Sequence, residues 1–195
     1  MPDLPLITRA RSHRGSIAFR TTATTHTYQD LLDRSAVLAA RLLGAADDLE
    51  ETRVALLVPA GFAYVAVQWA IWRAGGITVP ICLSATEPEW EYALTDSGAG
   101  IVVTDSAMGA KVAPLCARLD LRLVDIDTVA AAAEKTLPEI APKRRAMIPY
   151  TSGPTSKPKT LLTTQRTIPA RIDGPGGGGE WAAPGPGRPG GKTGR

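Results

Sequence analysis

The 195-residue sequence has few of the residues that bind metals or crosslink chains. It contains two cysteines, Cys82 and Cys116, which form no CxxC pattern, and two histidines. A disulfide framework or a zinc site needs more such residues at closer spacing, so neither is predicted. We expect both thiols to be buried and reduced, and we assign no metal-binding residue.

Long apolar runs and a strong charge excess are also missing. No stretch approaches the roughly 18 consecutive apolar residues of a membrane-spanning helix, so no membrane span is expected. The net charge of +3 is small and spread along the chain, so a nucleic-acid partner is not predicted. The N-terminus carries Arg9, Arg11 and Arg14 without the apolar core of a secretory signal. These features predict a cytoplasmic location, with a mitochondrial presequence as the alternative.

Helical and strand-like segments alternate from about Thr27 to Gly153, a pattern typical of an α/β fold whose mainly parallel sheet is flanked by helices. Thr27 with Asp30 three residues later predicts a capped helix start, and Gly44 stands where a helix-ending glycine belongs. We predict strands at 53–59, 77–82, 101–105, 121–127 and 144–150, and helices at 27–43, 61–76, 87–96, 107–119 and 128–135.

The composition changes abruptly after Asp173. The last 22 residues hold ten of the 19 glycines and four prolines. Such a segment buries too little apolar surface to offset its chain entropy. We therefore predict a folded unit over residues 1–173 and a Gly/Pro-rich disordered tail over 174–195, which is typical of a truncated or frame-shifted product.

The stretch YTSGPTSKPKT follows the last predicted strand and begins at Tyr150. A turn of small hydroxyl residues and glycine after a buried strand presents N–H groups and hydroxyls to phosphate oxygens, and lysine adds positive charge. We predict a phosphate-binding loop whose donors and cations are Thr151, Ser152, Thr155, Lys157 and Lys159.

Two other interpretations of this loop stay open at this point. One is a plain exposed turn after a strand. The other is the P-loop pattern GxxxxGK[ST] starting at Gly153, from which the sequence departs because Pro158 stands at the second glycine. Proline has no N–H and cannot adopt the glycine conformations that wrap phosphates.

The same stretch resembles the phosphate-binding motif of the adenylate-forming (AMP-binding) superfamily of acyl-CoA synthetases and ligases. The region 64–105 is similar to the superfamily's upstream signature, in which an apolar helix ends in Ala-Gly-Gly and a strand ends in Val-Pro. Among subfamilies, AVQWAIWRAGG and RRAMIPYTSG look most like malonyl-CoA synthetases. The segment 161–173 resembles the family's helix after the loop.

This resemblance implies an N-terminal part of the large domain of an adenylate-forming enzyme. Such ligases of fatty-acid metabolism use ATP, Mg²⁺ and coenzyme A to convert a small-molecule carboxylic acid to an acyl-adenylate and then to an acyl-CoA. The phosphate contacts it implies here, none of them a nucleophile, are Thr151, Ser152, Gly153, Thr155 and Lys159.

The sequence departs from the family pattern in two ways. Pro154, Ser156 and Thr160 replace a hydroxyl residue and two glycines of the motif, which predicts weakened ATP binding. The family's later motifs, including its Mg²⁺-binding glutamate and catalytic lysine, have no counterpart in this chain. We therefore expect an inactive truncated ligase. The alternatives are a non-catalytic interaction module with exposed apolar surface and a nucleic-acid binder that uses the basic tail.

Overall fold

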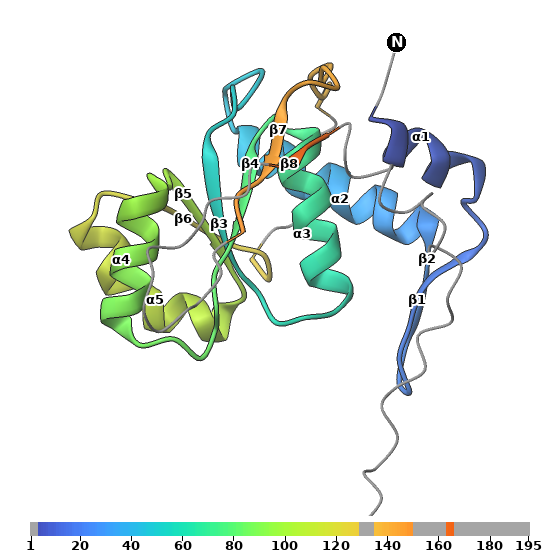
Figure 1. The fold of residues 1–195 in the computed structure, drawn as a ribbon. Helices are drawn as coiled ribbons and strands as arrows, with labels where there is room; N and C mark the ends of the chain where they lie inside the picture. The colour runs from blue at the N-terminus through green and yellow to red at the C-terminus, as the bar shows by residue number, and fades with distance from the viewer. Residues whose placement is uncertain (1–3, 129–134, 150–162, 166–195) are drawn as a thin grey trace, which may run out of the picture.

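A six-stranded sheet with helices on both faces forms the centre of the molecule (Figure 1). The structure is a computed structural model that describes residues 4–128, 135–149 and 163–165. Its elements, in chain order, are α1 (Pro5–Ser12), β1 (Ile17–Arg20), β2 (Thr25–Thr27), α2 (Tyr28–Leu43), β3 (Arg53–Leu57), α3 (Phe62–Arg73), β4 (Ile77–Pro80), α4 (Glu87–Ser97), β5 (Ile101–Thr104), α5 (Ser106–Arg118), β6 (Arg122–Asp125), β7 (Arg145–Met147) and β8 (Thr163–Thr164).

The sheet is mainly parallel, as the alternating sequence pattern predicts. Its strand order is β6-β5-β3-β4-β7-β8. The first five strands in that order pair in parallel, and β8 pairs with β7 in the antiparallel sense. The predicted α/β class with a mainly parallel sheet is therefore confirmed.

Helices cover the two faces of the sheet in different groups. In β3, Val54 and Leu56 join a core with α1, α2 and α3, whereas Ala55 and Leu57 join a second core with α4 and α5. All four side chains are at most 1% exposed. Successive side chains of a strand point to opposite faces, so a strand buried on both faces must be apolar at every position.

Local capping explains where the helices begin. The Thr27 hydroxyl accepts from the N–H of Asp30, and the Asp30 carboxylate accepts from the N–H of Thr27 at 2.7 Å, so the predicted capping box at the start of α2 is confirmed. Thr86 and Glu89 form the same arrangement at α4. Glu89 therefore serves the helix start, as its place in the first turn suggests.

Some expectations are incomplete or wrong. The helix α1 and the hairpin of β1 and β2 were not predicted, although Leu4, Ile7 and Ala10 of the N-terminal segment are buried. The expected burial of both thiols holds for Cys116 but is wrong for Cys82, which is exposed in the turn after β4. Most of the predicted helix at 128–135 and the whole predicted tail lie outside the described residues.

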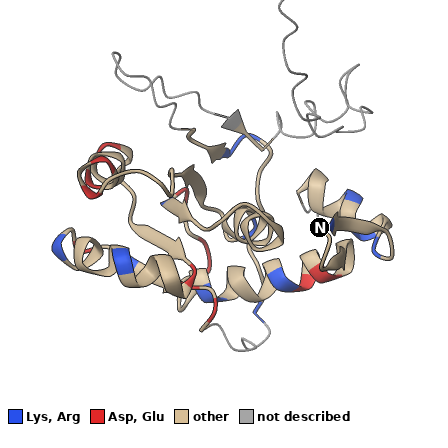
Figure 2. Cartoon of the chain, turned by 90° about the horizontal axis from the view of Figure 1, so that it is seen from below, with Lys and Arg blue, Asp and Glu red and all other residues tan. Residues whose placement is uncertain are grey.

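Charged and apolar surfaces follow this layering. Strands β4 and β5 carry no charged residue, whereas the helices on both faces carry Lys, Arg, Asp or Glu (Figure 2). Among the described residues, the large hydrophobic side chains that are exposed are Ile17 in β1 and Tyr92 in α4. None of the described helices has the length and apolar character needed to cross a membrane.

Candidate functional site

The predicted phosphate contacts Thr151, Ser152, Gly153, Thr155 and Lys159 all lie outside the described residues. The structure does describe the strand that leads to them and the chain that follows them. Strand β7 and the residues to Pro149 come before the loop, and β8 comes after it. The site can therefore be described from the scaffold that positions the loop.

The loop begins at the edge of the sheet where the parallel strands end. Strands β3, β4 and β7 run in the same direction, so their carboxyl ends lie along one edge. The turn after β3 leads to α3 on one face, and the turn after β4 leads to α4 on the other. A point where neighbouring strands send their connections to opposite faces leaves a crevice, and ligands of open α/β sheets bind at such points. The chain from β7 reaches this edge beside β4.

Main-chain pairing holds β7 only weakly. It has three residues, and its parallel pairing with β4 is between Thr78 and Met147. The N–H of Ile148 donates to the Thr78 carbonyl at 2.9 Å. Antiparallel pairing with β8 and side chains from distant parts of the sequence provide further contacts to β7.

Two ion pairs hold the start of β7 against the turn before β3. Arg145 donates from Nη2 and Nε to one oxygen of Glu51, at 2.6 Å and 3.0 Å, and its own N–H donates to the other oxygen at 2.8 Å. Arg144 donates to Oδ1 of Asp48 at 2.7 Å. These bonds lower the pKa of Glu51, chiefly through the Arg145 side chain, and raise the pKa of both arginines.

The turn that carries these carboxylates has an unusual backbone. Glu50 and Glu51 have φ values of 48° and 65°, a left-handed region that costs a non-glycine residue about 1–2 kcal/mol. The N–H of Glu50 donates to Asp48 Oδ1 at 2.7 Å, and the N–H of Glu51 donates to the Gly75 carbonyl at 2.8 Å. These bonds hold the turn in the conformation that directs Glu51 toward Arg145.

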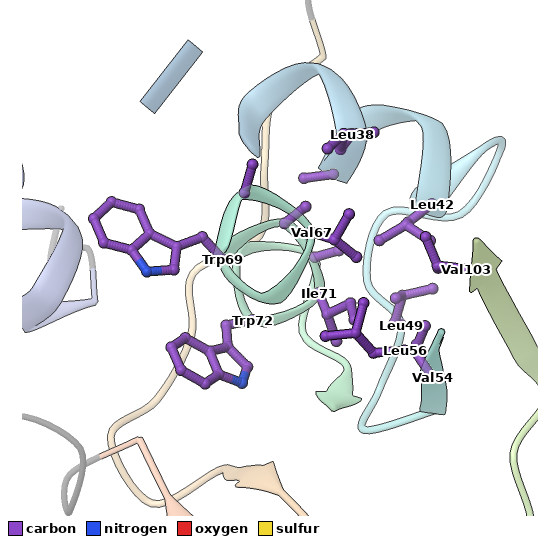
Figure 3. Close-up of a cluster of buried hydrophobic side chains, with 14 of the residues drawn as sticks. Leu38, Leu42, Leu49, Val54, Leu56, Val67, Trp69, Ile71, Trp72 and Val103 are labelled. Atoms are coloured by element: carbon purple, nitrogen blue, oxygen red, sulfur yellow. The ribbon is translucent and has the colours of Figure 1, made fainter. Parts of the chain in front are cut away.

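Helix α3 supplies a second set of contacts to β7. Trp72 donates from Nε1 to the Ala146 carbonyl at 2.7 Å, and Gln68 lies with Nε2 3.7 Å from the sulfur of Met147. Figure 3 shows Trp69 and Trp72 projecting from α3 on the side away from Leu38 and Leu42. The prediction that the two tryptophans are core residues is confirmed, since each is 5% exposed.

The residues that fix β7 were not predicted from the sequence. The available signal in the sequence is charge, because acidic residues cluster at 47–51 and basic residues at 143–145. Opposite charge over two short segments favours contact but does not show which residues pair. The Trp72 hydrogen bond has no counterpart in the sequence pattern, because it joins residues 74 positions apart.

The chain after the loop also differs from expectation. The segment 161–173 was expected to form a helix, but Thr163–Thr164 form strand β8, and the N–H of Gln165 donates to the Arg144 carbonyl at 3.0 Å. The helix prediction is therefore wrong for these residues. Because β8 runs antiparallel to β7, the described residues Pro149 and Thr163, which flank positions 150–162, lie toward the same edge of the sheet.

The described residues hold no second reactive cluster. No group of three or more His, Cys, Asp or Glu side chains within them has a geometry that suits a metal ion. The exposed thiol of Cys82 has a lowered pKa because the Ser84 hydroxyl is within 3.2 Å of its sulfur. The Asp105 carboxylate accepts from the N–H of Met108 at the start of α5, which accounts for its position at the end of β5.

The fold of the described residues and the motif that follows β7 in the sequence point to a known class of protein. The AMP-binding enzyme family matches residues 6–175, so the chain belongs to that family. The mitochondrial malonate–CoA ligase ACSF3 of Mus musculus is 35% identical over 183 residues, which is 88% of this chain and 31% of the relative. The enzyme of the same name from Homo sapiens is 33% identical over 181 residues. The chain therefore spans about a third of the length of these relatives.

Solved structures share the fold. MatB from Rhodopseudomonas palustris superposes with a TM-score of 0.74 at 22% identity, over 87% of this chain and 36% of that chain. The O-succinylbenzoate coenzyme A synthetase MenE from Bacillus subtilis, solved in complex with AMP, gives a TM-score of 0.72 at 26% identity, over 84% of this chain and 42% of that chain. The described residues therefore have the fold of the first part of adenylate-forming enzymes.

Proposed function

We propose that this chain is the N-terminal part of an ATP-dependent acid–thiol ligase and that malonate is the acid of the intact enzyme. The observation that supports this most is the 35% identity to a malonate–CoA ligase over 88% of the chain. The similarity extends across the parallel sheet and the strand that delivers the loop, so it does not depend on a short motif.

The reaction of such a ligase has two steps. A carboxylate oxygen attacks the α-phosphorus of ATP, so a carbon–oxygen–phosphorus link forms and the bond to the β-phosphate breaks, releasing pyrophosphate. The thiol of coenzyme A then attacks the carbonyl carbon, loses its proton and displaces AMP. The first step needs positive charge and hydrogen-bond donors around the leaving pyrophosphate.

Thr151, Ser152, Gly153, Thr155 and Lys159 are the residues proposed to supply that environment. Mg²⁺ neutralises phosphate charge when it is bound with the nucleotide. The contribution proposed for these five residues is hydroxyl groups, backbone N–H groups and the lysine ammonium.

Binding of Mg-ATP to the chain tests this assignment by titration calorimetry. We expect weak binding, which Lys159→Met decreases about tenfold because a charge-assisted contact is worth roughly 1.5–3 kcal/mol. Lys157→Met is the matched control, since it removes the same charge two residues away and leaves the motif intact. Equal losses in the two variants, or no binding by the natural sequence, would contradict the assignment.

The departures from the motif provide a second test. Pro154→Thr together with Ser156→Gly restores one hydroxyl, one N–H and one glycine. We expect ATP affinity to increase by roughly a hundredfold or more, because each restored contact contributes about 1–3 kcal/mol. An unchanged affinity would show that these two residues do not limit binding.

We also propose that the chain alone does not complete the ligation. It spans 31% of the length of the malonate–CoA ligases it matches. The test combines the chain with ATP, Mg²⁺, malonate and coenzyme A and follows the formation of malonyl-CoA. Formation of malonyl-CoA by the chain alone would overturn this part of the proposal.

The relatives also support a compartment for the intact enzyme. The malonate–CoA ligases matched here are mitochondrial by name, so of the two locations predicted from the sequence we favour the mitochondrion. Microscopy of the natural protein with a C-terminal fluorescent label tests the choice, and a diffuse cytoplasmic signal would exclude it.

A further inference from the structure

Two side chains on one face of α3 contact consecutive residues of β7. Gln68 and Trp72 are four positions apart, so they lie one turn apart on the same side of the helix. Trp72 donates to the Ala146 carbonyl at 2.7 Å, and Gln68 contacts the Met147 sulfur at 3.7 Å. Helix α3 therefore contacts two of the three residues of β7, the strand that comes before the predicted phosphate loop in the sequence.

These contacts matter because the main-chain pairing of β7 is short. Met147 pairs with Thr78 of β4, and Arg145 and Met147 pair with β8 in an irregular register, whereas β3 pairs with β4 at four positions. Tyr150, the first residue of the motif, follows Met147 by three positions. A change in the tilt or depth of β7 is therefore transmitted directly to the start of the loop.

The Trp72 contact is a buried hydrogen bond with one defined donor and one defined acceptor. The indole is 5% exposed and Ala146 is fully buried, so the bond forms away from water. A buried indole N–H needs an acceptor, and a bond with fixed donor and acceptor positions sets the distance between helix and strand more closely than apolar contact does. The longer Gln68 contact fixes the next residue less tightly.

We propose that Trp72 and Gln68 are positioning residues that set where β7 delivers the phosphate loop and thereby raise ATP affinity without touching the nucleotide. The effect on ATP rests on the function proposed above. The positional effect on β7 does not, since it follows from contacts between described residues. The two parts are therefore tested by separate measurements.

The chain offers a matched control on the same helix. Trp69 is also 5% exposed and belongs to the same core as Trp72. Its indole makes no hydrogen bond to the described residues of β7. Trp72→Phe and Trp69→Phe thus remove the same atoms from equally buried sites, and only the former removes a donor to β7.

The experiment combines hydrogen exchange by mass spectrometry with ATP titration on the whole chain. We expect Trp72→Phe to speed exchange about fivefold in peptides covering 145–162, with little change in peptides from β3 and β5, because losing one hydrogen bond favours local opening. Trp69→Phe should leave exchange at 145–162 unchanged. Where ATP binds, Trp72→Phe should weaken it about fivefold and Trp69→Phe by less than twofold.

Each outcome decides one of the two parts. Unchanged exchange at 145–162 in Trp72→Phe, or equal effects of the two variants, would overturn the positioning role whatever the ATP result. Faster local exchange with unchanged ATP affinity would overturn the link to the nucleotide. If the natural chain binds no ATP, the proposed function fails for this chain while the exchange result still decides the position of β7.

A second variant covers the case in which Trp72→Phe does not fold. Gln68→Met keeps a long, flexible side chain and removes the N–H donor to Met147. We expect about a twofold increase in exchange at 145–162, in line with the longer contact. Exchange identical to that of the natural chain in this variant would remove Gln68 from the proposal.

Discussion

Strands β3 and β7 lie in one sheet and run in the same direction, yet they are held in place by different interactions. Strand β3 has five residues, with four paired positions to β4 and four to β5. Strand β7 has three residues and one paired position with β4, followed by an irregular antiparallel pairing with β8. Strand β3 is fixed mainly by main-chain pairing over its whole length, whereas β7 combines shorter pairing with side-chain contacts.

The difference separates what stabilises the fold from what positions β7. Four side chains of β3 are buried in the two cores, so their removal affects the whole molecule. The side-chain contacts to β7 and to Arg144 before it come from the turn before β3 and from α3, and their loss should affect this part of the sheet. The residues that make these contacts are Asp48, Glu51, Gln68 and Trp72.

The largest expected effect is in β3. Leu56→Ala removes a side chain that is 1% exposed and leaves a cavity between the strand and the helices of its face. We expect a loss of about 3 kcal/mol in the free energy of unfolding, measured by urea denaturation. The loss should appear equally by fluorescence and by hydrogen exchange in every strand.

Strand β7 provides the comparison for this variant. Met147→Ala removes a half-buried side chain from a strand held by its neighbours' side chains, so its loss of unfolding free energy should be less than half that of Leu56→Ala. Equal losses would show that the two strands contribute alike to global stability and would remove the distinction drawn between them.

A smaller effect is expected at Gly75, beside the turn that holds β7. Its φ is +85°, and a Cβ there would collide with the Asp48 carboxylate and approach the Arg144 guanidinium to 2.8 Å. Gly75→Ala should therefore cost about 2 kcal/mol from backbone strain and the displaced ion pair together. Urea denaturation gives the cost, and exchange at 143–149 should increase more than exchange in β5.

Gly44→Ala separates the effect of backbone strain from the effect of the displaced ion pair. Its φ is +55°, but the nearest atom to a Cβ is a nitrogen of Arg122 at 3.7 Å, so strain acts there without a collision. We expect a loss of unfolding free energy of about 1 kcal/mol with exchange at 143–149 unchanged. If both variants lose the same unfolding free energy and neither increases exchange at 143–149, the packing of Asp48 against Gly75 does not hold β7 in place.

The comparison also explains which parts of the fold could be predicted. The sequence RVALL is apolar after its first residue, and β-branched or aliphatic residues in a short run indicate a strand buried on both faces. The capping box at Thr27 is local, because its partner is three residues away. Strand type, helix starts and the parallel class depend on such local signals.

The remaining features depend on contacts between residues far apart in the chain. Glu51 and Arg145 are separated by 94 positions, and the sequence does not show that they meet. The N-terminal helix α1 was missed because its apolar residues are few and lie among arginines. The phosphate loop was predicted from its motif and stays a prediction, because its residues lie outside the described part of the chain.

The smallest expected effect concerns the ion pair of Glu51 and Arg145 and depends on pH. The Arg145 side chain holds the pKa of Glu51 below its ordinary value of 4.5, so the pair adds stability above that pH and loses it as pH falls through the lowered pKa. Glu51→Gln should cost about 1 kcal/mol at pH 7, since both side chains are partly exposed to solvent. Urea denaturation of both proteins at pH 7 and at pH 3 measures the difference, which should shrink at the lower pH.

Glu50→Gln is the control for this prediction, because it removes a carboxylate from the same turn at an exposed position. A change that came from the net charge of the turn would be the same in both variants, whereas the bidentate contact to Arg145 belongs to Glu51. We therefore expect Glu51→Gln alone to increase exchange in 145–149. If Glu50→Gln matches it in stability and in exchange, general electrostatic attraction between the acidic and basic segments holds β7, and the specific pair does not.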